Sequence, residues 1–73
     1  MSEQSDELKK LAAIAVDLGL SAEIRTKAIE LMGHIGTHEA LLALLNLAAN
    51  EKLFREEREL ALKQAREIIR AGH

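Results

Sequence analysis

Two histidines four residues apart, His34 and His38, have the spacing that could most simply do chemistry in this chain. On a continuous helix, residues i and i+4 share one face, so the two imidazoles could bind a metal ion with Glu39 adjacent. However, Gly36 and Thr37 lie between the histidines, and both residue types are typical of helix ends. We therefore interpret the histidines as polar residues beside a loop and predict no metal site.

Catalysis has few candidate groups in this sequence. The serines at positions 2, 5 and 21 are terminal or stand where helices are capped, and there is no glycine-rich phosphate loop. The acidic residues fall almost entirely on the expected solvent-exposed faces of helices. The absence of cysteine excludes disulfides and cysteine-ligated zinc. The sequence thus predicts a protein that is not an enzyme and has no cofactor.

A basic stretch in the last third of the chain could attract nucleic acid. Its members are Arg55, Arg58, Lys63, Arg66 and Arg70. Glutamates at positions 56, 57, 59 and 67 are interleaved with them, the net charge of the chain is −2, and one phenylalanine is the only aromatic residue. The glutamates cancel a phosphate-attracting field, and no platform for stacking bases exists. Nucleic acid is therefore not the expected partner.

One segment, AVDLGLSAEIR, keeps DNA binding open as an alternative. It resembles a helix-turn-helix motif, with Ala15 and Gly19 in register. Arg25 replaces the apolar residue expected six positions after the glycine, and Ile24 lies one position short of it. The second hypothesis is therefore a small DNA-binding regulator with a helix-turn-helix-like N-terminal half.

The composition of the chain indicates a single all-α domain over residues 1–73. Hydrophobic residues make up 48% and charged residues 30%, there is no proline, and the helix formers Ala, Leu, Glu, Lys and Arg dominate. β-Sandwiches and barrels are disfavoured because they need frequent turns and β-branched or aromatic strands. No apolar run approaches the ~18 residues of a membrane span, so we expect a soluble, cytoplasmic protein.

Turn and capping residues divide the chain into four expected helices. The first runs from about residue 5 to residue 18 and is stopped by Gly19, and the second lies between Ser21 as N-cap and Gly36. The third is capped by Thr37 and ends near residue 49, with Asn50 expected in a left-handed conformation. The fourth starts between residues 52 and 55 and ends at about residue 71.

Apolar residues at i, i+3 and i+4 spacing predict which side of each helix is buried. In the first helix these are Leu8, Leu11, Ala12, Ala15 and Leu18. In the second helix they are Ile24, Ala28, Leu31, Met32 and Ile35. In the fourth they are Leu53, Leu60 or Ala61, Ala65 and Ile68. One core between the helices is therefore expected.

An internal repeat appears when the chain is aligned with itself at an offset of 33 residues. Eight of the 40 overlapping positions are identical, and no gap is needed. Leu11 falls on Leu44 and Ala28 on Ala61, all at positions expected to face inward. We therefore predict two helical hairpins, of about residues 5–36 and 37–71, stacked side by side.

This repeat resembles the HEAT-repeat family. In that pattern the second helix of a unit opens with an acidic residue, a β-branched residue and arginine, continues with alanine, and ends in Gly-x-Ile-Gly. The matching residues here are Glu23, Ile24, Arg25, Ala28, Gly33, Ile35 and Gly36. The second unit departs from the pattern because Glu57 replaces the β-branched residue, and both units lack the family's Asp-Pro turn. The resemblance implies two stacked HEAT-like helical hairpins that bind other macromolecules, without catalytic residues.

The resemblance also implies a role for Arg25 and Arg58, which occupy equivalent positions in the two units. In the family this arginine usually bonds backbone or acidic groups of the neighbouring turn. Asp17, in the preceding turn, is accordingly the expected partner of Arg25. We favour this structural role over binding of a ligand.

The third helix is apolar around nearly its whole circumference, with only Asn46 polar in its middle. Such a helix is buried on several sides. Either the other three helices cover it, or another chain completes its outer side. We favour another chain, most simply in a twofold homodimer, and the candidate contact residues are Leu42, Leu45, Ala49 and Phe54. The sequence thus predicts a protein-interaction or scaffolding module, and the competing hypothesis is a marginal monomer whose apolar surface binds a different protein.

Overall fold

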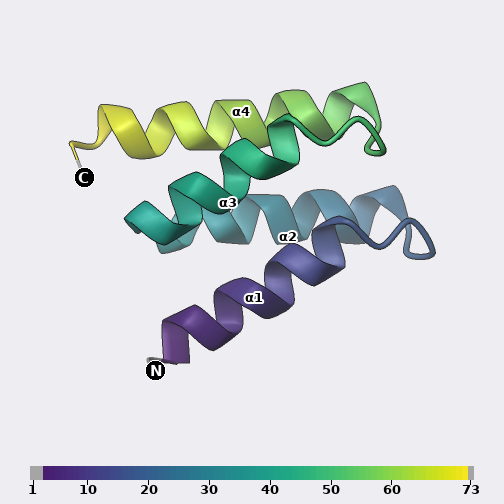
Figure 1. The fold of residues 1–73 in the computed structure, drawn as a ribbon, viewed down its shortest axis with the longest axis horizontal. Coiled ribbons are helices and arrows are strands. Elements are labelled where there is room, and N and C mark those ends of the chain that lie inside the picture. Colours follow the sequence, from purple (N-terminus) through teal and green to yellow (C-terminus); the bar gives the residue numbers. More distant parts are fainter. Residues whose placement is uncertain (1–2, 73) are drawn as a thin grey trace.

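The structure, a computed structural model, describes residues 3–72, and every regular element in that range is a helix (Figure 1). The helices are α1 (Glu3–Ala15), α2 (Ala22–Ile35), α3 (His38–Ala48) and α4 (Arg55–Arg70). This confirms the predicted all-α class. α1 and α2 form the first hairpin, and α3 and α4 form the second.

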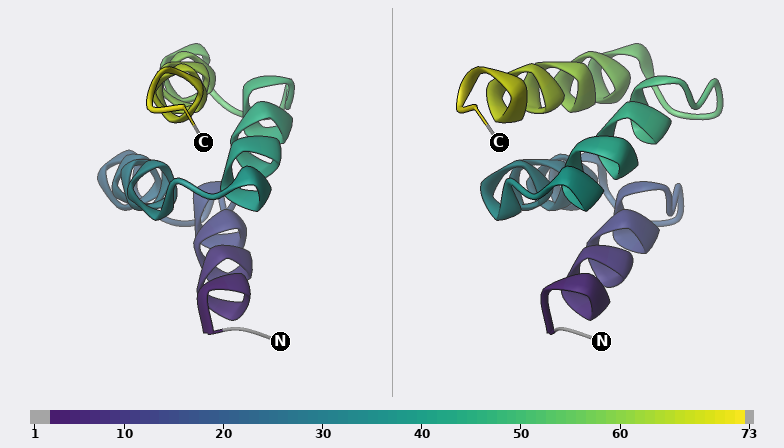
Figure 2. Two further views of the ribbon diagram at one scale, coloured as in Figure 1. Left: turned by 90° about the vertical axis from the view of Figure 1, so that its left-hand side faces the viewer. Right: turned by 60° about the vertical axis from the view of Figure 1, so that its left-hand side comes forward.

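The two hairpins stack on one another in two layers. α2 and α4 lie side by side in one layer, while α1 and α3 form the other (Figures 1 and 2). α3 contacts all three other helices, because it packs on α4 within its own hairpin and on α1 and α2 of the first hairpin. The core lies between these layers.

Capping residues set the start of α2, the end of α2 and the start of α3 as the sequence predicts. The Ser21 hydroxyl accepts a hydrogen bond from the Ile24 backbone N–H at 3.3 Å, and the Thr37 hydroxyl accepts one from Ala40 N–H at 3.1 Å. Gly36 ends α2 with φ of 67°, the left-handed conformation that favours glycine. Each cap therefore satisfies backbone groups that the helix itself leaves without partners.

The predicted end of the first helix and the predicted left-handed conformation of Asn50 are wrong, whereas the third helix ends at Ala48, close to the predicted residue 49. α1 ends at Ala15 rather than near residue 18, and neither Gly19 nor Asn50 adopts a positive φ. The Asp17 carboxylate accepts a hydrogen bond from Gly19 N–H at 2.9 Å, and Asn50 Oδ1 accepts one from Lys52 N–H at 3.0 Å. Short polar side chains of this kind compete with the helix for backbone partners, so these turns replace the expected glycine and asparagine stops.

These turns also demonstrate the 33-residue repeat in three dimensions. The first and third helices end at equivalent positions, residues 15 and 48, and the second and fourth begin at equivalent positions, residues 22 and 55. Backbone hydrogen bonds from residue 17 to 14 and from residue 20 to 17 recur from residue 50 to 47 and from residue 53 to 50. The caps differ, since Phe54 stands where Ser21 caps α2 and offers no side-chain acceptor to α4.

Most residues predicted to face inward are buried. Leu11, Ala28, Leu44 and Ala61, which the repeat pairs with one another, all lie in the core. α2 is the exception, because its buried residues are Arg25, Ala28, Ile29 and Met32. Ile24 and Leu31, expected in the core, are exposed, and Leu18 lies on the surface beyond the end of α1. α4 packs on the side of α2 that carries Arg25 and Ile29, which leaves the side of Ile24 and Leu31 uncovered.

Gly33 lies where α2 and α4 approach each other closely. A Cβ atom at this position would be 2.0 Å from Gln64 Oε1 and 3.1 Å from Gln64 Cβ. Glycine within a helix is disfavoured by about 1 kcal/mol relative to alanine. Here its missing side chain leaves the space that Gln64 occupies.

Replacement of Ala61 by leucine tests the packing between the hairpins. Ala61 is fully buried, so added methyl groups should overpack the core and lower the free energy of unfolding by about 1–3 kcal/mol. Ala13→Leu on the exposed side of α1 is the matched control and should have little effect. Urea denaturation followed by circular dichroism measures both, and equal stability of the two variants would show that Ala61 is not tightly packed.

Candidate interaction surfaces

A buried ion pair joins the two hairpins. Arg25 on α2 donates from Nε to Glu57 Oε1 at 3.3 Å and from Nη2 to Glu57 Oε2 at 2.9 Å. The two side chains are only 4% and 3% exposed. Arg25 Nη1 donates a further hydrogen bond to the backbone carbonyl of Leu20. The guanidinium thus ties the turn of the first hairpin to the first helical turn of α4.

The structural role predicted for Arg25 is confirmed, but its predicted partner is wrong. Asp17 uses its carboxylate within its own turn, and Glu57 is the acid that Arg25 binds. The sequence offered one signal for this pairing. Glu57 interrupts the repeat at the position where the first unit has Ile24, and a charged residue at a position expected to be apolar needs a partner if it is buried.

Phe54 lies against this ion pair. The Arg25 guanidinium carbon is 5.5 Å from the centre of the phenylalanine ring, close enough for a cation–π contact. Phe54 is nevertheless 60% exposed, and it lines a groove with Ala22, Thr26 and Glu56 near the N-terminal ends of α2 and α4. The ring is therefore accessible to a partner molecule.

The other three candidate contact residues form one line on α3, which we call the α3 ridge. Leu42, Leu45 and Ala49 follow one another at i, i+3 and i+7, and all are exposed. The opposite side of α3 is buried through Ala40 and Leu44. Phe54 does not belong to this ridge, because the groove that it lines is formed by α2 and α4. The structure thus places the four predicted residues on two surfaces.

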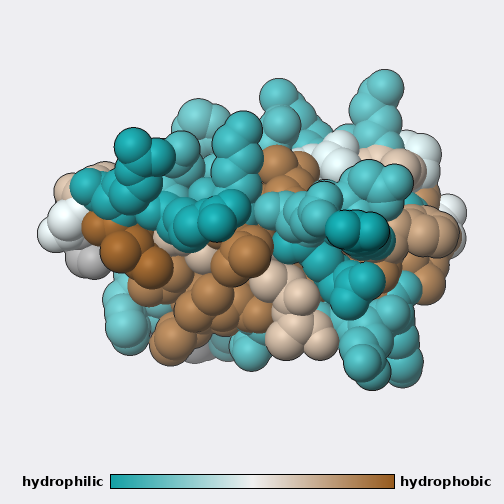
Figure 3. Space-filling model, turned by 90° about the horizontal axis from the view of Figure 1, so that it is seen from above, coloured by the Kyte–Doolittle hydropathy of each residue, from teal (hydrophilic) through white to brown (hydrophobic). Residues whose placement is uncertain are grey.

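The outer side of the second hairpin carries a further, mostly apolar surface, which we call the C-terminal end face. It consists of Leu41, Ala48, Arg58, Leu62 and Ile69. Leu62 and Ile69 are exposed, whereas the other three are partly buried. In the view from the α4 side, a band of hydrophobic surface lies beside the hydrophilic surface of the charged residues (Figure 3). Leu62 and Ile69 were not predicted contact residues, because the candidates were sought on the more apolar third helix.

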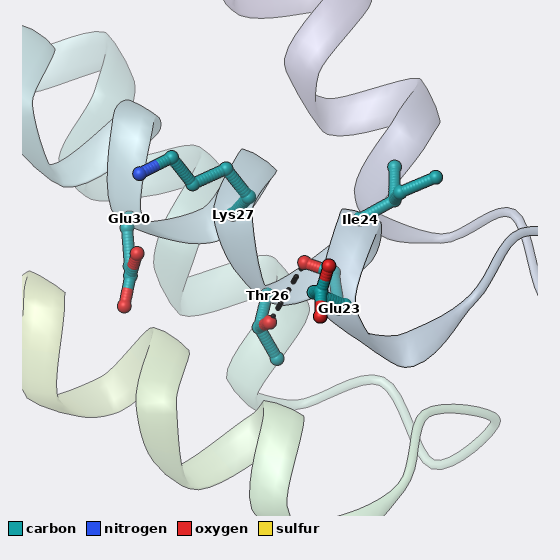
Figure 4. A pocket seen from close by; sticks show the side chains of 5 residues that line it. All are labelled: Glu23, Ile24, Thr26, Lys27 and Glu30. Carbon is teal, nitrogen blue, oxygen red and sulfur yellow. Dashed lines mark hydrogen bonds between the residues drawn. The ribbon is translucent and has the colours of Figure 1, made fainter.

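The outer side of the first hairpin is also uncovered. A groove there is lined almost entirely by apolar atoms of Leu11, Ile14, Ile24, Lys27, Ala28 and Leu31. A second hollow, on α2, is lined by Glu23, Ile24, Thr26, Lys27 and Glu30. In this hollow Ile24 and Lys27 point to one side of the helix and Thr26 and Glu30 to the other, and the Thr26 hydroxyl donates to the Glu23 carbonyl at 3.0 Å (Figure 4).

The arrangement of α2 gives little support to the helix-turn-helix alternative. Such a motif would need basic or polar residues on the open side of α2 to reach a DNA groove. That side instead carries Ile24 and Leu31, with Lys27 as the one charged residue that lines the groove there. Arg25 is buried in the ion pair with Glu57 and is not available to phosphate groups.

The histidine pair does not share a helix. His34 lies in the last turn of α2, and His38 is the first residue of α3, so the predicted helix break between them is confirmed. Within residues 3–72, no three His, Asp or Glu side chains are grouped closely enough to hold a metal ion. None of the helices in this range is both long and apolar enough to cross a membrane.

Comparison with known proteins gives no match: no family model fits the chain, and no curated protein or solved structure is significantly similar to it. The functional argument therefore depends on the geometry and chemistry of these surfaces. Three features stand out, namely the ion pair between the hairpins, the α3 ridge and the uncovered ends of the stack.

A double-mutant cycle tests the ion pair. Arg25→Met or Glu57→Leu alone leaves one buried charge without its partner and should lower the free energy of unfolding by about 3–5 kcal/mol. The double variant should be much more stable than the sum of the two effects predicts, since apolar side chains then replace both charges. Urea denaturation measures all four proteins.

The exposed pair of Arg55 and Glu59 provides the control for this cycle. Its Nε–Oε2 distance is 3.2 Å, but the side chains are 80% and 65% exposed. Removal of either charge should change the free energy of unfolding by less than about 1 kcal/mol. Additive effects of the Arg25 and Glu57 substitutions would contradict the proposed coupling.

Proposed function

We propose that this chain is a non-enzymatic protein-interaction or scaffolding module of HEAT-like type that associates with itself, most simply as a twofold dimer. The main observation in support is the α3 ridge, a line of exposed leucines on the helix with the most apolar composition. Solvated positions of a helix are normally polar, so a continuous apolar line is typical of a contact surface.

The small number of repeats supports the same proposal. Stacked repeats bury their apolar sides against neighbours, and terminal repeats of a long stack carry polar outer sides. Within residues 3–72 each hairpin packs on one other hairpin, yet each has an apolar outer side. Association with other protein surfaces would remove these side chains from water.

Twofold symmetry is the simplest way for the α3 ridge to be covered. In a twofold dimer the same patch is used by both copies, so Leu42 and Leu45 of one copy would pack on the ridge of the other. Phe54 lies on a separate surface and would contribute only if the interface extends past the end of α3. A cytoplasmic location remains the prediction from composition.

Sedimentation equilibrium over a wide concentration range tests self-association. We expect a mass above the 8.1 kDa of one chain at micromolar concentrations. Leu42→Glu should weaken the dimer at least tenfold, since it places a charge in the apolar contact, while circular dichroism should show that the helices persist.

Leu18→Glu is the matched control for this experiment. Leu18 is equally exposed but lies in the turn after α1, away from the α3 ridge, so its replacement should leave the mass unchanged. A wild-type mass that stays at 8.1 kDa up to high micromolar concentrations would reject the dimer.

A further inference from the structure

The C-terminal end face is equivalent, in the 33-residue repeat, to the side of the first hairpin on which the second hairpin packs. Ile29 on α2 has no exposed surface, because the second hairpin covers it, whereas its repeat equivalent Leu62 on α4 is 41% exposed. Ala15 is likewise fully buried, and its equivalent Ala48 is only partly buried. The C-terminal end face therefore has the side chains of a hairpin-binding surface, without a hairpin on it in this chain.

The hydrogen bonds of Arg58 also differ from those of its equivalent in the first hairpin. It is the repeat equivalent of Arg25, whose Nε donates to the Glu57 carboxylate of the next hairpin. Arg58 Nε is buried too, but it has no hydrogen-bond partner among residues 3–72. A buried donor without an acceptor is unfavourable, and nearly all such groups in folded proteins find a partner. The Arg58 side chain as a whole is only partly buried, so an incoming carboxylate would bind the accessible part of its guanidinium group as Glu57 binds Arg25.

A second copy of this chain lacks that carboxylate. If two copies stacked head to tail in the way that the hairpins stack, Ile24 of one copy would lie opposite Arg58 of the other, because Ile24 is the equivalent of Glu57. An isoleucine side chain cannot accept a hydrogen bond, so the guanidinium would be buried without a partner. The C-terminal end face is therefore better suited to another protein that has a carboxylate at this position than to a second copy of this chain.

We propose that the C-terminal end face binds a helical hairpin of a partner protein that carries a glutamate opposite Arg58. Apolar side chains of the partner would pack on Leu41, Ala48 and Leu62, and its glutamate would accept hydrogen bonds from the guanidinium. The proposal rests on the proposed function, for which it names the class of partner, but it uses a surface other than the α3 ridge.

The chain itself supplies a probe for this site. The probe carries Ile24→Glu, which offers a carboxylate at the position equivalent to Glu57, and Leu62→Glu, which blocks its own end face so that chains cannot grow. The matched control probe carries Leu62→Glu alone. Each probe is labelled at its amino terminus and titrated with the wild-type protein, and binding is followed by fluorescence anisotropy. The α3 ridge is identical in the two probes, so their difference reports the end face.

We expect the wild-type protein to bind the Ile24→Glu probe at least tenfold more tightly than the control probe. Arg58→Gln in the titrated protein should abolish this difference. Lys63→Gln, which removes one exposed charge from another side of α4, should preserve it. Circular dichroism melts of both titrated variants establish that they are folded.

Equal binding of the two probes, or no binding of either, would overturn the proposal. Tighter binding of the control probe would overturn it as well, and would identify a second copy as the occupant. Sedimentation of the wild-type protein alone decides self-association separately, so a failure of this proposal is distinguishable from a failure of the proposed function.

Discussion

The buried ion pair between Arg25 and Glu57 is the contact on which the stacking of the two hairpins depends. Both groups are removed from water, and the cost of that transfer is offset only when the charges meet with their hydrogen bonds complete. Two bonds to the carboxylate and one to the Leu20 carbonyl meet this condition. A shift of one hairpin along the other by a helical turn would separate the charges while they remain buried. The ion pair therefore favours the observed register over one that is shifted by a helical turn.

A stack of only two units has one internal junction and two uncovered sides. At the junction, Ile29 and Met32 are fully buried. On the uncovered sides, residues of the same chemical type, such as Leu31 and Ile69, are exposed. Both outcomes follow from one repeating pattern, since each unit has an apolar surface on both sides and only one neighbour. The exposed apolar side chains thus lie where the described hairpins have no neighbour, and this exposure is the physical argument for the proposed interaction role.

Local signals in the sequence predicted the helices and the repeat, because serine, threonine and glycine act on the backbone next to them. Periodicity placed the buried side of α2 about one residue away from its true position, since apolar residues flank both sides of that helix and local pattern does not identify which side meets a neighbour. The ion pair was missed for a related reason. Arg25 and Glu57 lie 32 residues apart, and charged residues are rarely buried, so the pairing became visible only with the stacked hairpins. The exposed leucines of α3 were expected to be accessible. The exposure of Leu62 was not predicted, because α4 is rich in charged residues.

The need of a buried arginine for a carboxylate partner also disfavours contacts with surfaces that lack a carboxylate. Apolar surfaces at opposite ends of a molecule invite head-to-tail contacts, which grow into open filaments unless the geometry closes. The two units differ at the position that meets this arginine, since the first has Ile24 where the second has Glu57. Because of this difference, a head-to-tail contact would bury Arg58 against a hydrocarbon side chain, and desolvation of the guanidinium would oppose it. The interaction that joins the two hairpins within one chain would therefore be incomplete in a head-to-tail contact between two copies of the chain.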